Sequence, residues 1–398
     1  MRPVKSLKNQ FDLEEYIRRL EFNKTEPEVL SSLIKKAINE GKDFQKLLRA
    51  IKSNADVLKD KLFDDGVIDC LEISIEDKEK LAKSAITSID GSRQIVGGRG
   101  KRYYIMLSVA IVELEQGIYG NFRVRYPNIE LIPFEDPTGD KIEALGQDLM
   151  LLIETEALKR KIKECNSDEC IMLDGPIVDP PRESSDEFKN LLKNIGYIDN
   201  RCNILKEAWK QDIKIYGFVK NIKTDNFLKN SLAMMNDDLN KYVDIYASDE
   251  ELIFTILTLL HLKQKENSKK QKIFFTKPCP APIKIPIYHR YFQNDVKIYY
   301  TYSMPYLGGK AYRLEIAAPK DANENDIKRD LLEGIKLTTT LTLPGQRIPI
   351  PIYLAHEKCK IRKGAAEIIY REILAKGISI TDELNETLEL VKYYMTYL

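Results

Sequence analysis

Two short apolar runs that each end in Asp-Gly, with a long helical pattern between them, constrain the fold of this chain most strongly. The runs are SAITSIDGS at 84–92 and CIMLDGP at 170–176, and both have the length and β-branched content of a strand. We therefore expect Asp90 and Asp174 at or near the ends of buried strands, where a rigid backbone holds their carboxylates. Asp-Gly is also a common turn dipeptide, so either motif alone could simply close a strand.

The residues between the two runs predict how the strands are connected. Residues 101–112 suit a second strand, paired with the first across a glycine-rich loop at 91–100. Apolar residues at helical spacing over 140–163 predict an amphipathic helix that leads into the Asp174 strand. If the Asp90 and Asp174 strands are parallel neighbours, this helix is the crossover, and the two carboxylates meet near one edge of the sheet.

The chain has 398 residues and 43% hydrophobic content, enough for a substantial core. Helical spacing of apolar residues from 7 to 62 predicts a helical N-terminal segment, residues 1–83, with a role in assembly or partner contact. No internal repeat or linker interrupts residues 84–398, which we predict to be one α/β domain with insertions. Its further elements are strands at 213–220, 297–303 and 311–317, and helices at 250–262, 326–337 and 381–394.

Charge and cysteine content narrow the function class. Lysine plus arginine (62) nearly cancels aspartate plus glutamate (61), so any site for a polyanion must be local. The six cysteines are scattered without a Cys-x-x-Cys pair, which favours reduced thiols in a cytoplasm and disfavours structural zinc. No apolar stretch is long enough for a signal region or a membrane span, so neither export nor membrane insertion is expected.

The converging aspartates predict a divalent metal site, because neighbouring carboxylates repel and are costly to desolvate unless a cation lies between them. The 140–163 helix would supply a third carboxylate. Glu154 shares a face with Met150 and Ala157 and points toward the sheet, whereas Glu156 points to the flank. We favour Glu154 and keep both as metal ligands. His356, in YLAHEK at 353–358, would add a ligand or a proton donor.

Two metal ions held by such a set would activate a water and neutralise a phosphate, which is the chemistry of phosphodiester hydrolysis. In order and spacing, these elements resemble the NurA family of nucleases. The matching motifs are IDGS at 89–92, the helix with both glutamates, MLDG at 172–175, RLE at 313–315 and PIYLAHE at 351–357. The resemblance implies Asp90, one helix glutamate, Asp174 and His356 as the metal and catalytic set.

The same resemblance implies a fold and a biological setting. The fold would be RNase H-like, a mixed α/β sheet flanked by helices. The activity would be 5′ to 3′ exonucleolytic and single-strand endonucleolytic cleavage of DNA, with two Mn²⁺ ions and Mg²⁺ as the alternative. The protein would work as a homodimer docked on a HerA-type hexameric translocase during resection of broken DNA ends.

Interleaved aromatic and basic residues predict where a DNA strand would bind. YHRYF at 288–292 and KIYYTY at 297–302 offer planar faces for bases and charge for phosphates, with Arg290, Tyr300 and Tyr302 as the candidate contacts. Lys220, at a predicted strand end, would reach a phosphate near the metals. Aromatic residues are also good strand formers, and a strand-end lysine is often only solvated.

Two other classes of function stay open at this stage. An actin-like ATPase or sugar kinase also begins with a strand and an acidic glycine turn that meets phosphates. It would need a second phosphate hairpin and an adenosine-binding glycine motif, and neither is visible downstream. A catalytically inactive nuclease fold could serve as a translocase adaptor, although clustered buried carboxylates give a scaffold no advantage.

Overall fold

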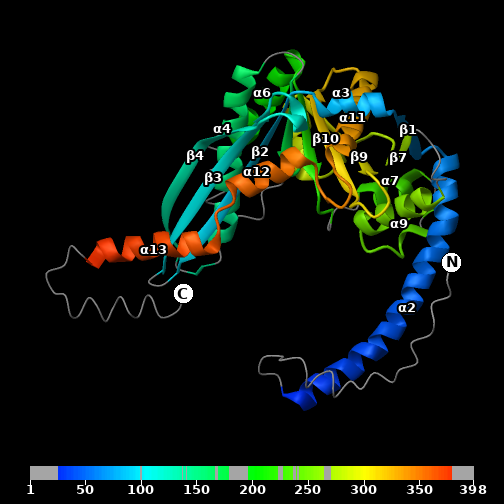
Figure 1. The fold of residues 1–398 in the computed structure, drawn as a ribbon, viewed down its shortest axis with the longest axis horizontal. Helices are drawn as coiled ribbons and strands as arrows, with labels where there is room; N and C mark the ends of the chain where they lie inside the picture. The colour runs from blue at the N-terminus through cyan, green and yellow to red at the C-terminus, as the bar shows by residue number, and fades with distance from the viewer. Residues whose placement is uncertain are drawn as a thin grey trace.

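The computed structural model describes residues 26–98, 101–136, 138–139, 141–165, 169–178, 196–222, 227–235, 239, 242–263 and 270–378. A ten-stranded mixed sheet forms its centre and helices cover both faces (Figure 1). The strands are β1 (Ile68–Ile73), β2 (Ile86–Gly97), β3 (Arg102–Leu114), β4 (Arg123–Glu135), β5 (Cys170–Asp174), β6 (Lys214–Val219), β7 (Gln271–Thr276), β8 (Cys279–Pro280), β9 (Val296–Met304) and β10 (Tyr312–Pro319). Their order is β1-β7-β9-β10-β6-β5-β2-β3-β4, with β8 beside β9. The predicted α/β class, a mixed sheet flanked by helices, is confirmed.

The centre of the sheet is parallel and both of its sides are antiparallel. β5 pairs in parallel with β2 and with β6, whereas β3, β4, β10, β9, β7 and β1 pair with their neighbours in antiparallel fashion. Helix α4 (Ile142–Glu164) is the connection that returns the chain from β4 to β5. The predicted parallel pair with a helical crossover is therefore confirmed.

One sequence prediction about β2 is wrong. Residues 91–100 were expected to form a loop after the Asp90 strand, but β2 continues to Gly97. The reason is that β3 pairs with β2 from Ile86 to Gly97, and this long antiparallel ladder keeps the chain extended beyond Asp90. Asp90 therefore lies within a strand, not at its end.

Helices divide between the two faces of the sheet, and the strands alternate accordingly. Ile89, Ile171 and Ile215 belong to one apolar core, whereas Ile86 and Met172 belong to the other. The first core contains residues of α2 (Pro27–Asp64), α4, α6 (Tyr197–Lys210), α7 (Phe227–Met235), α9 (Asp249–Leu262) and α10 (Pro286–Gln293). The second is covered by α3 (Ile75–Ala82), α11 (Glu324–Leu341) and α12 (Ile350–Cys359). None of the described helices combines the length and apolar composition that a membrane crossing requires.

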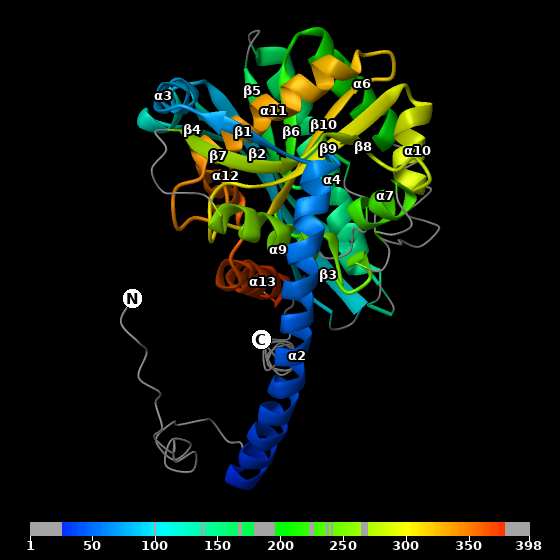
Figure 2. The same cartoon turned by 90° about the vertical axis from the view of Figure 1, so that its right-hand side faces the viewer.

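The N-terminal segment is only partly separate from the sheet. The last turns of α2 are buried against α9, while its earlier turns project away from the body (Figure 2). Strand β1 and helix α3 also lie within the segment that was predicted to be helical, residues 1–83. β1 pairs with β7 and completes one edge of the sheet, so the all-helical description is wrong there. The proposed boundary at residue 84 stays a prediction.

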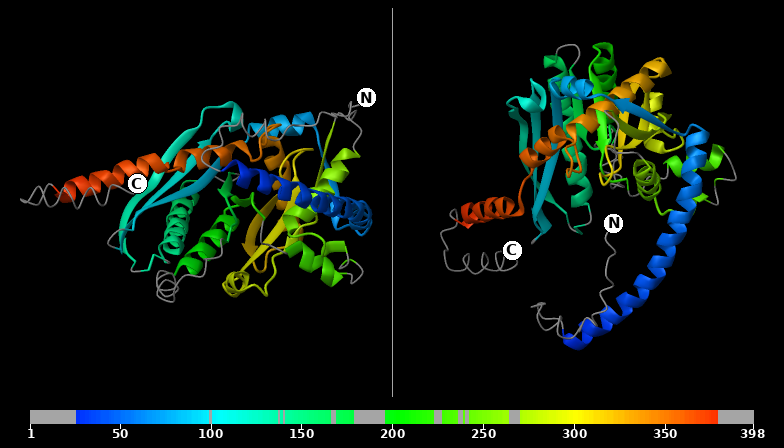
Figure 3. Two further views of the ribbon diagram at one scale, coloured as in Figure 1. Left: turned by 90° about the horizontal axis from the view of Figure 1, so that it is seen from below. Right: turned by 45° about the vertical axis from the view of Figure 1, so that its right-hand side comes forward.

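At the other end of the chain, α13 (Lys363–Ile378) packs against β2 and extends away from the sheet (Figure 3). Its Tyr370 ring lies 6.0 Å from the Tyr104 ring of β3. The helix predicted at 381–394 and residues 1–25 lie outside the described residues.

Candidate metal centre

The register of the parallel strands brings the two aspartates together. Leu173 of β5 is paired with Ile89 of β2, so Asp174 and Asp90 occupy the next positions on adjacent strands. Both point to the face covered by α11 and α12, because side chains alternate along a strand and Ile86 and Met172 face that way. Asp90 is 5% exposed, and the Asp174 side chain is 4% exposed.

Helix α12 places His356 over the two carboxylates. Its Nδ1 lies 2.9 Å from Asp90 Oδ2 and 3.3 Å from Asp174 Oδ2. One ligand atom from each of the three residues lies within 4.8 Å of the others. Hydrogen bonds to Asp174 and Asp90 raise the pKa of His356 to about 9, so the ring carries a proton at neutral pH. Three residues far apart in the sequence thus form one compact cluster.

Lys220 follows β6 and adds a second cation. Its Nζ donates to Asp174 Oδ2 at 2.6 Å. Burial raises the pKa of Asp174, but the hydrogen bond from His356 and the charge of Lys220 outweigh burial and lower the pKa. No lysine of the described residues pairs with Asp90, and burial, reinforced by the negative charge of Asp174, raises the pKa of Asp90. The two neighbouring carboxyls are therefore pushed in opposite directions.

Cys359 is a member of this cluster that sequence reasoning missed. It lies three residues after His356 on α12, and its Sγ donates to Asp90 Oδ2 at 3.3 Å. Burial raises the pKa of this thiol, so it remains a neutral donor. The i, i+3 spacing to a candidate histidine was the available signal. All six cysteines are unpaired.

The structure distinguishes the two helix glutamates. Glu156 is exposed, whereas Glu154 is partly buried and lies against the backbone of Gly91, the residue after Asp90. A Cβ at position 91 would stand 2.9 Å from Glu154 Cγ, so glycine is what allows this approach. The inward direction argued from the helical face is the one observed. Whether Glu154 or Glu156 binds metal stays a prediction.

The clustered donors suit a divalent cation. Two carboxylates and an imidazole are donors that Mn²⁺ and Mg²⁺ accept in proteins. His356 Nδ1 and the ammonium of Lys220 both lie against Asp174 Oδ2, so positive charge gathers where the two carboxylates meet. Asp90, Asp174 and His356 would hold such a cation, with Glu154 approaching from the other face of the sheet.

Two of the predicted DNA contacts are wrong. Tyr300 and Tyr302 are buried in the core on the face opposite to Asp90, and the Tyr302 hydroxyl donates to Asp249 Oδ2 at 2.8 Å. They pack in this core because β9 is an inner strand, covered by helices on that face. Arg290 is exposed on α10, which packs against β9 and α6. Of the four predicted DNA contacts, Lys220 is the one that lies beside the aspartates.

A second group of buried charges lies on that opposite face. We call it the arginine cluster: Arg201, Glu315 and Arg313. Arg313 Nε and Nη2 donate to Glu315 Oε1 at 2.9 and 2.8 Å, and the backbone N–H of Ile177 donates to Glu315 Oε2 at 2.9 Å. Arg201 Nη2 donates to the Ile177 carbonyl at 3.1 Å. The cluster therefore fixes the chain just after Asp174.

The turn that leaves Asp174 also requires glycine. Gly175 has φ of 135°, in the region that side chains rarely adopt, and its N–H donates to the Phe218 carbonyl at 3.0 Å. On the next strand, a Cβ at Gly217 would lie 2.6 Å from the Ile177 nitrogen. The Asp-Gly motif at 174–175 thus serves both the carboxylate and the turn.

The chain matches one protein family in sequence and is similar to solved nuclease structures. A family model described as the NurA domain matches residues 84–361. The NurA nuclease from Sulfolobus solfataricus is 14% identical over 88% of this chain and 98% of its own, with a TM-score of 0.55. A NurA structure with dAMP and manganese is 13% identical over 87% and 99%, with a TM-score of 0.41. Endonuclease V from Ciona intestinalis with DNA is 11% identical over 74% and 96%, with a TM-score of 0.28. No curated protein sequence matches.

Proposed function

Because the chain belongs to the NurA family of nucleases, we propose that it is a deoxyribonuclease that depends on Mn²⁺, with Mg²⁺ as the alternative. Two ions would be held by Asp90, Asp174, His356 and a glutamate of α4. The observation that carries this proposal is the convergence of two buried aspartates and His356 within 4.8 Å. The proposed activities are 5′ to 3′ exonuclease and single-strand endonuclease.

Each residue of the cluster has a role that follows from its position. When bound, divalent cations would neutralise the phosphate and lower the pKa of an attacking water. Asp90 and Asp174 would hold them rigidly, since both stand on paired strands. Lys220 places a positive charge beside Asp174, where a phosphate oxygen would bind. His356 would serve in one of two ways: as a neutral imidazole that binds an ion, or as the protonated ring of the metal-free cluster, which would donate its proton to the leaving oxygen.

Digestion of end-labelled DNA tests this proposal directly. Single- and double-stranded substrates labelled at either the 5′ or the 3′ end would be incubated with Mn²⁺, Mg²⁺ or EDTA. We expect cleavage with Mn²⁺, slower cleavage with Mg²⁺, none with EDTA, and shortening from the 5′ end. Intact DNA under every condition would overturn the nuclease proposal, and shortening from the 3′ end would overturn the polarity.

We also propose a homodimer that docks on a HerA-type hexameric ATPase and resects broken DNA ends in the cytoplasm. The support within this chain is the projecting part of α2, where Leu33, Phe44, Leu47 and Leu48 are exposed. The same helix buries Ile51, Ala55, Leu58 and Leu62 in the body of the protein. An exposed apolar stripe that continues from a buried one is suited to a protein interface.

Substitution of the stripe tests this assembly. Leu47→Glu together with Leu48→Glu should lower the mass seen by light scattering, or weaken capture of a HerA-type ATPase. The control is Lys42→Glu, a change at an exposed polar position of the same helix. Cleavage of short single strands should persist, because none of the proposed metal ligands lies on α2. Unchanged mass and unchanged capture would overturn a role for α2 in assembly.

A further inference from the structure

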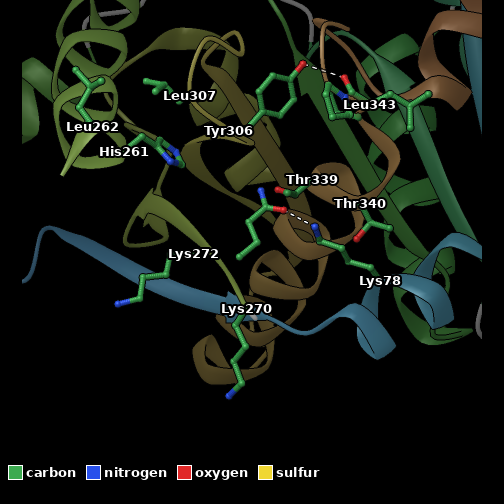
Figure 4. A pocket seen from close by; sticks show the side chains of 13 residues that line it. Lys78, His261, Leu262, Lys270, Lys272, Tyr306, Leu307, Thr339, Thr340 and Leu343 are labelled. Carbon is green, nitrogen blue, oxygen red and sulfur yellow. Dashed lines mark hydrogen bonds between the residues drawn. The ribbon is translucent and has the colours of Figure 1, made fainter. Parts of the chain in front are cut away.

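A cavity of about 840 Å³ lies between the start of β7, the end of α9, the loop after β9 and the C-terminal end of α11 (Figure 4). Its lining includes three lysines, Lys78 on α3 with Lys270 and Lys272 at β7, and among the described residues that line it there is no aspartate or glutamate. Tyr306 adds an aromatic ring. This combination of cations and an aromatic face suits a phosphate-bearing ligand.

Lys78 holds its ammonium in a partly buried position. Its ammonium donates to Gln271 Oε1, and burial alone lowers its pKa, with no carboxylate of the described residues opposing that effect. Lys270 and Lys272 both approach one carboxylate, Glu72, at 3.5 and 3.9 Å. Two of the three lysines thus approach the same carboxylate, and a bound anion would offset the desolvation of Lys78.

The cavity and the metal centre lie along the same edge of the sheet. Asp174 and Lys220 stand where β5 and β6 end, and antiparallel β9 ends at that edge before Tyr306. Gln271 Nε2 donates to the Pro305 carbonyl at 2.6 Å, which ties β7 to the same loop. Four strand spacings separate β5 from β7 in the sheet order, or roughly 19 Å.

The segment that carries His356 also connects the two places. Leu343 lines the cavity, and the chain continues from it into α12. The Tyr306 hydroxyl donates to the Leu343 carbonyl at 2.9 Å, so the cavity wall anchors this connection. A polyanion lying along the edge would meet Lys220 and then the three lysines of the cavity.

We propose that this cavity binds backbone phosphates of the single DNA strand whose scissile phosphate lies at the metal centre. The inference rests on the proposed nuclease function and adds a substrate-length requirement to it. A strand long enough to reach from Asp174 to Lys78 gains the additional contacts, and a shorter one does not.

Binding of labelled oligothymidylates of graded length, roughly 4 to 16 nucleotides, tests the proposal in EDTA, where no hydrolysis occurs. Fluorescence anisotropy would give the affinity at several salt concentrations. For the longer strands, Lys78→Gln and Lys272→Gln should each weaken binding about tenfold and reduce the salt slope by about 0.7. The shortest strands should bind as they do to wild type. Lys80→Gln, on the same helix but outside the lining, is the matched control.

The outcomes separate the two proposals. An equal loss at every length, no loss with either lysine variant, or the same loss with Lys80→Gln would overturn the strand-binding cavity. Inorganic phosphate that displaces long strands and short strands equally would also overturn it in favour of a small-anion site. The nuclease proposal fails separately, if wild type cleaves no strand with Mn²⁺ even though binding depends on length. Equal melting temperatures for the lysine variants and wild type establish that the fold is intact.

Discussion

The metal centre and the arginine cluster are both groups of buried charges, yet they are built in opposite ways. In the arginine cluster, both oxygens of Glu315 accept hydrogen bonds and Arg313 is 2% exposed. In the metal centre, His356 lies against both carboxylates and Lys220 donates to Asp174, and the side chains of these two donors are 41% and 28% exposed. One cluster is closed and paired, whereas the other is open to solvent and holds like charges together.

This difference indicates that the arginine cluster stabilises the fold and that the metal centre serves the reaction. A buried ion pair with its hydrogen bonds satisfied fixes local geometry, and removal of one partner destabilises the fold because the other charge stays buried without compensation. Neighbouring carboxylates repel, so a fold retains them where a cation or a substrate makes use of them. Mutations in the two clusters should therefore change different properties.

The largest expected effect is the loss of cleavage at the metal centre. Asp90→Asn and Asp174→Asn should each lower the rate of DNA hydrolysis roughly 10⁴-fold. Asp90→Asn should not lower the melting temperature in EDTA, because burial and the charge of Asp174 disfavour the ionised form of Asp90. Asp174→Asn should lower it modestly, because it removes the charged partner of Lys220 and His356. Asp321→Asn, at an exposed position, is the control. Full activity in either variant would show that its aspartate is not needed for cleavage, and the two clusters would then not differ in function.

The opposite pattern is expected at the arginine cluster. Glu315→Gln leaves Arg313 buried without its counter-charge and should cost about 3–5 kcal/mol of unfolding free energy, measured with urea. Replacing both residues, Arg313→Met with Glu315→Leu, should recover part of that loss. A Glu315→Gln protein with unchanged stability but no cleavage would place this cluster in the catalytic machinery instead.

The two glutamates of α4 test whether the metal centre includes a residue from the opposite face of the sheet. Glu154 lies against Gly91, next to Asp90, on the face of the arginine cluster. Glu154→Gln should lower the cleavage rate about 10–100-fold, and Glu156→Gln should leave it unchanged. Melting of both proteins controls for folding. The reverse result would mean that Glu156 is the ligand and that the helical-face argument is wrong.

The smallest effect concerns pH. The pKa of His356 is about 9 in the folded chain and about 6.5 in an unfolded one. Protonated His356 therefore stabilises the metal-free fold below about pH 6.5, and this contribution is lost as pH rises toward 9. Urea titrations in EDTA across this window should show the decline in wild type and a smaller decline in His356→Gln. His289→Gln, at an exposed position on α10, should behave as wild type.

The metal centre could be anticipated from the sequence because its parts obey local rules. Two strand-like runs, one helical pattern between them and the right-handed crossover rule are enough to make Asp90 and Asp174 neighbours. His356 was proposed as a ligand or proton donor from its residue type, and the family resemblance then implied it as a member of the set, since no local pattern connects α12 to β2.

Other features depended on partners that a local pattern does not reveal. Asp90 lies inside β2 because β3 is long enough to pair beyond it. Tyr300 and Tyr302 fit both a binding surface and a core strand, and only the position of β9 inside the sheet decides between them. The burial of Arg313 likewise reflects its long-range contacts with β6 and β9.

The paired register of β2 and β5 also limits how the length of this chain can change. Four consecutive pairs, from Ile86 with Cys170 to Ile89 with Leu173, precede the aspartates. One inserted residue within that stretch would turn Asp90 to the opposite face, away from Asp174 and His356. Insertions in the hairpin between β2 and β3 leave this alternation unchanged. Length variation compatible with cleavage should therefore accumulate beyond Val96 and be absent from Ile86 to Asp90.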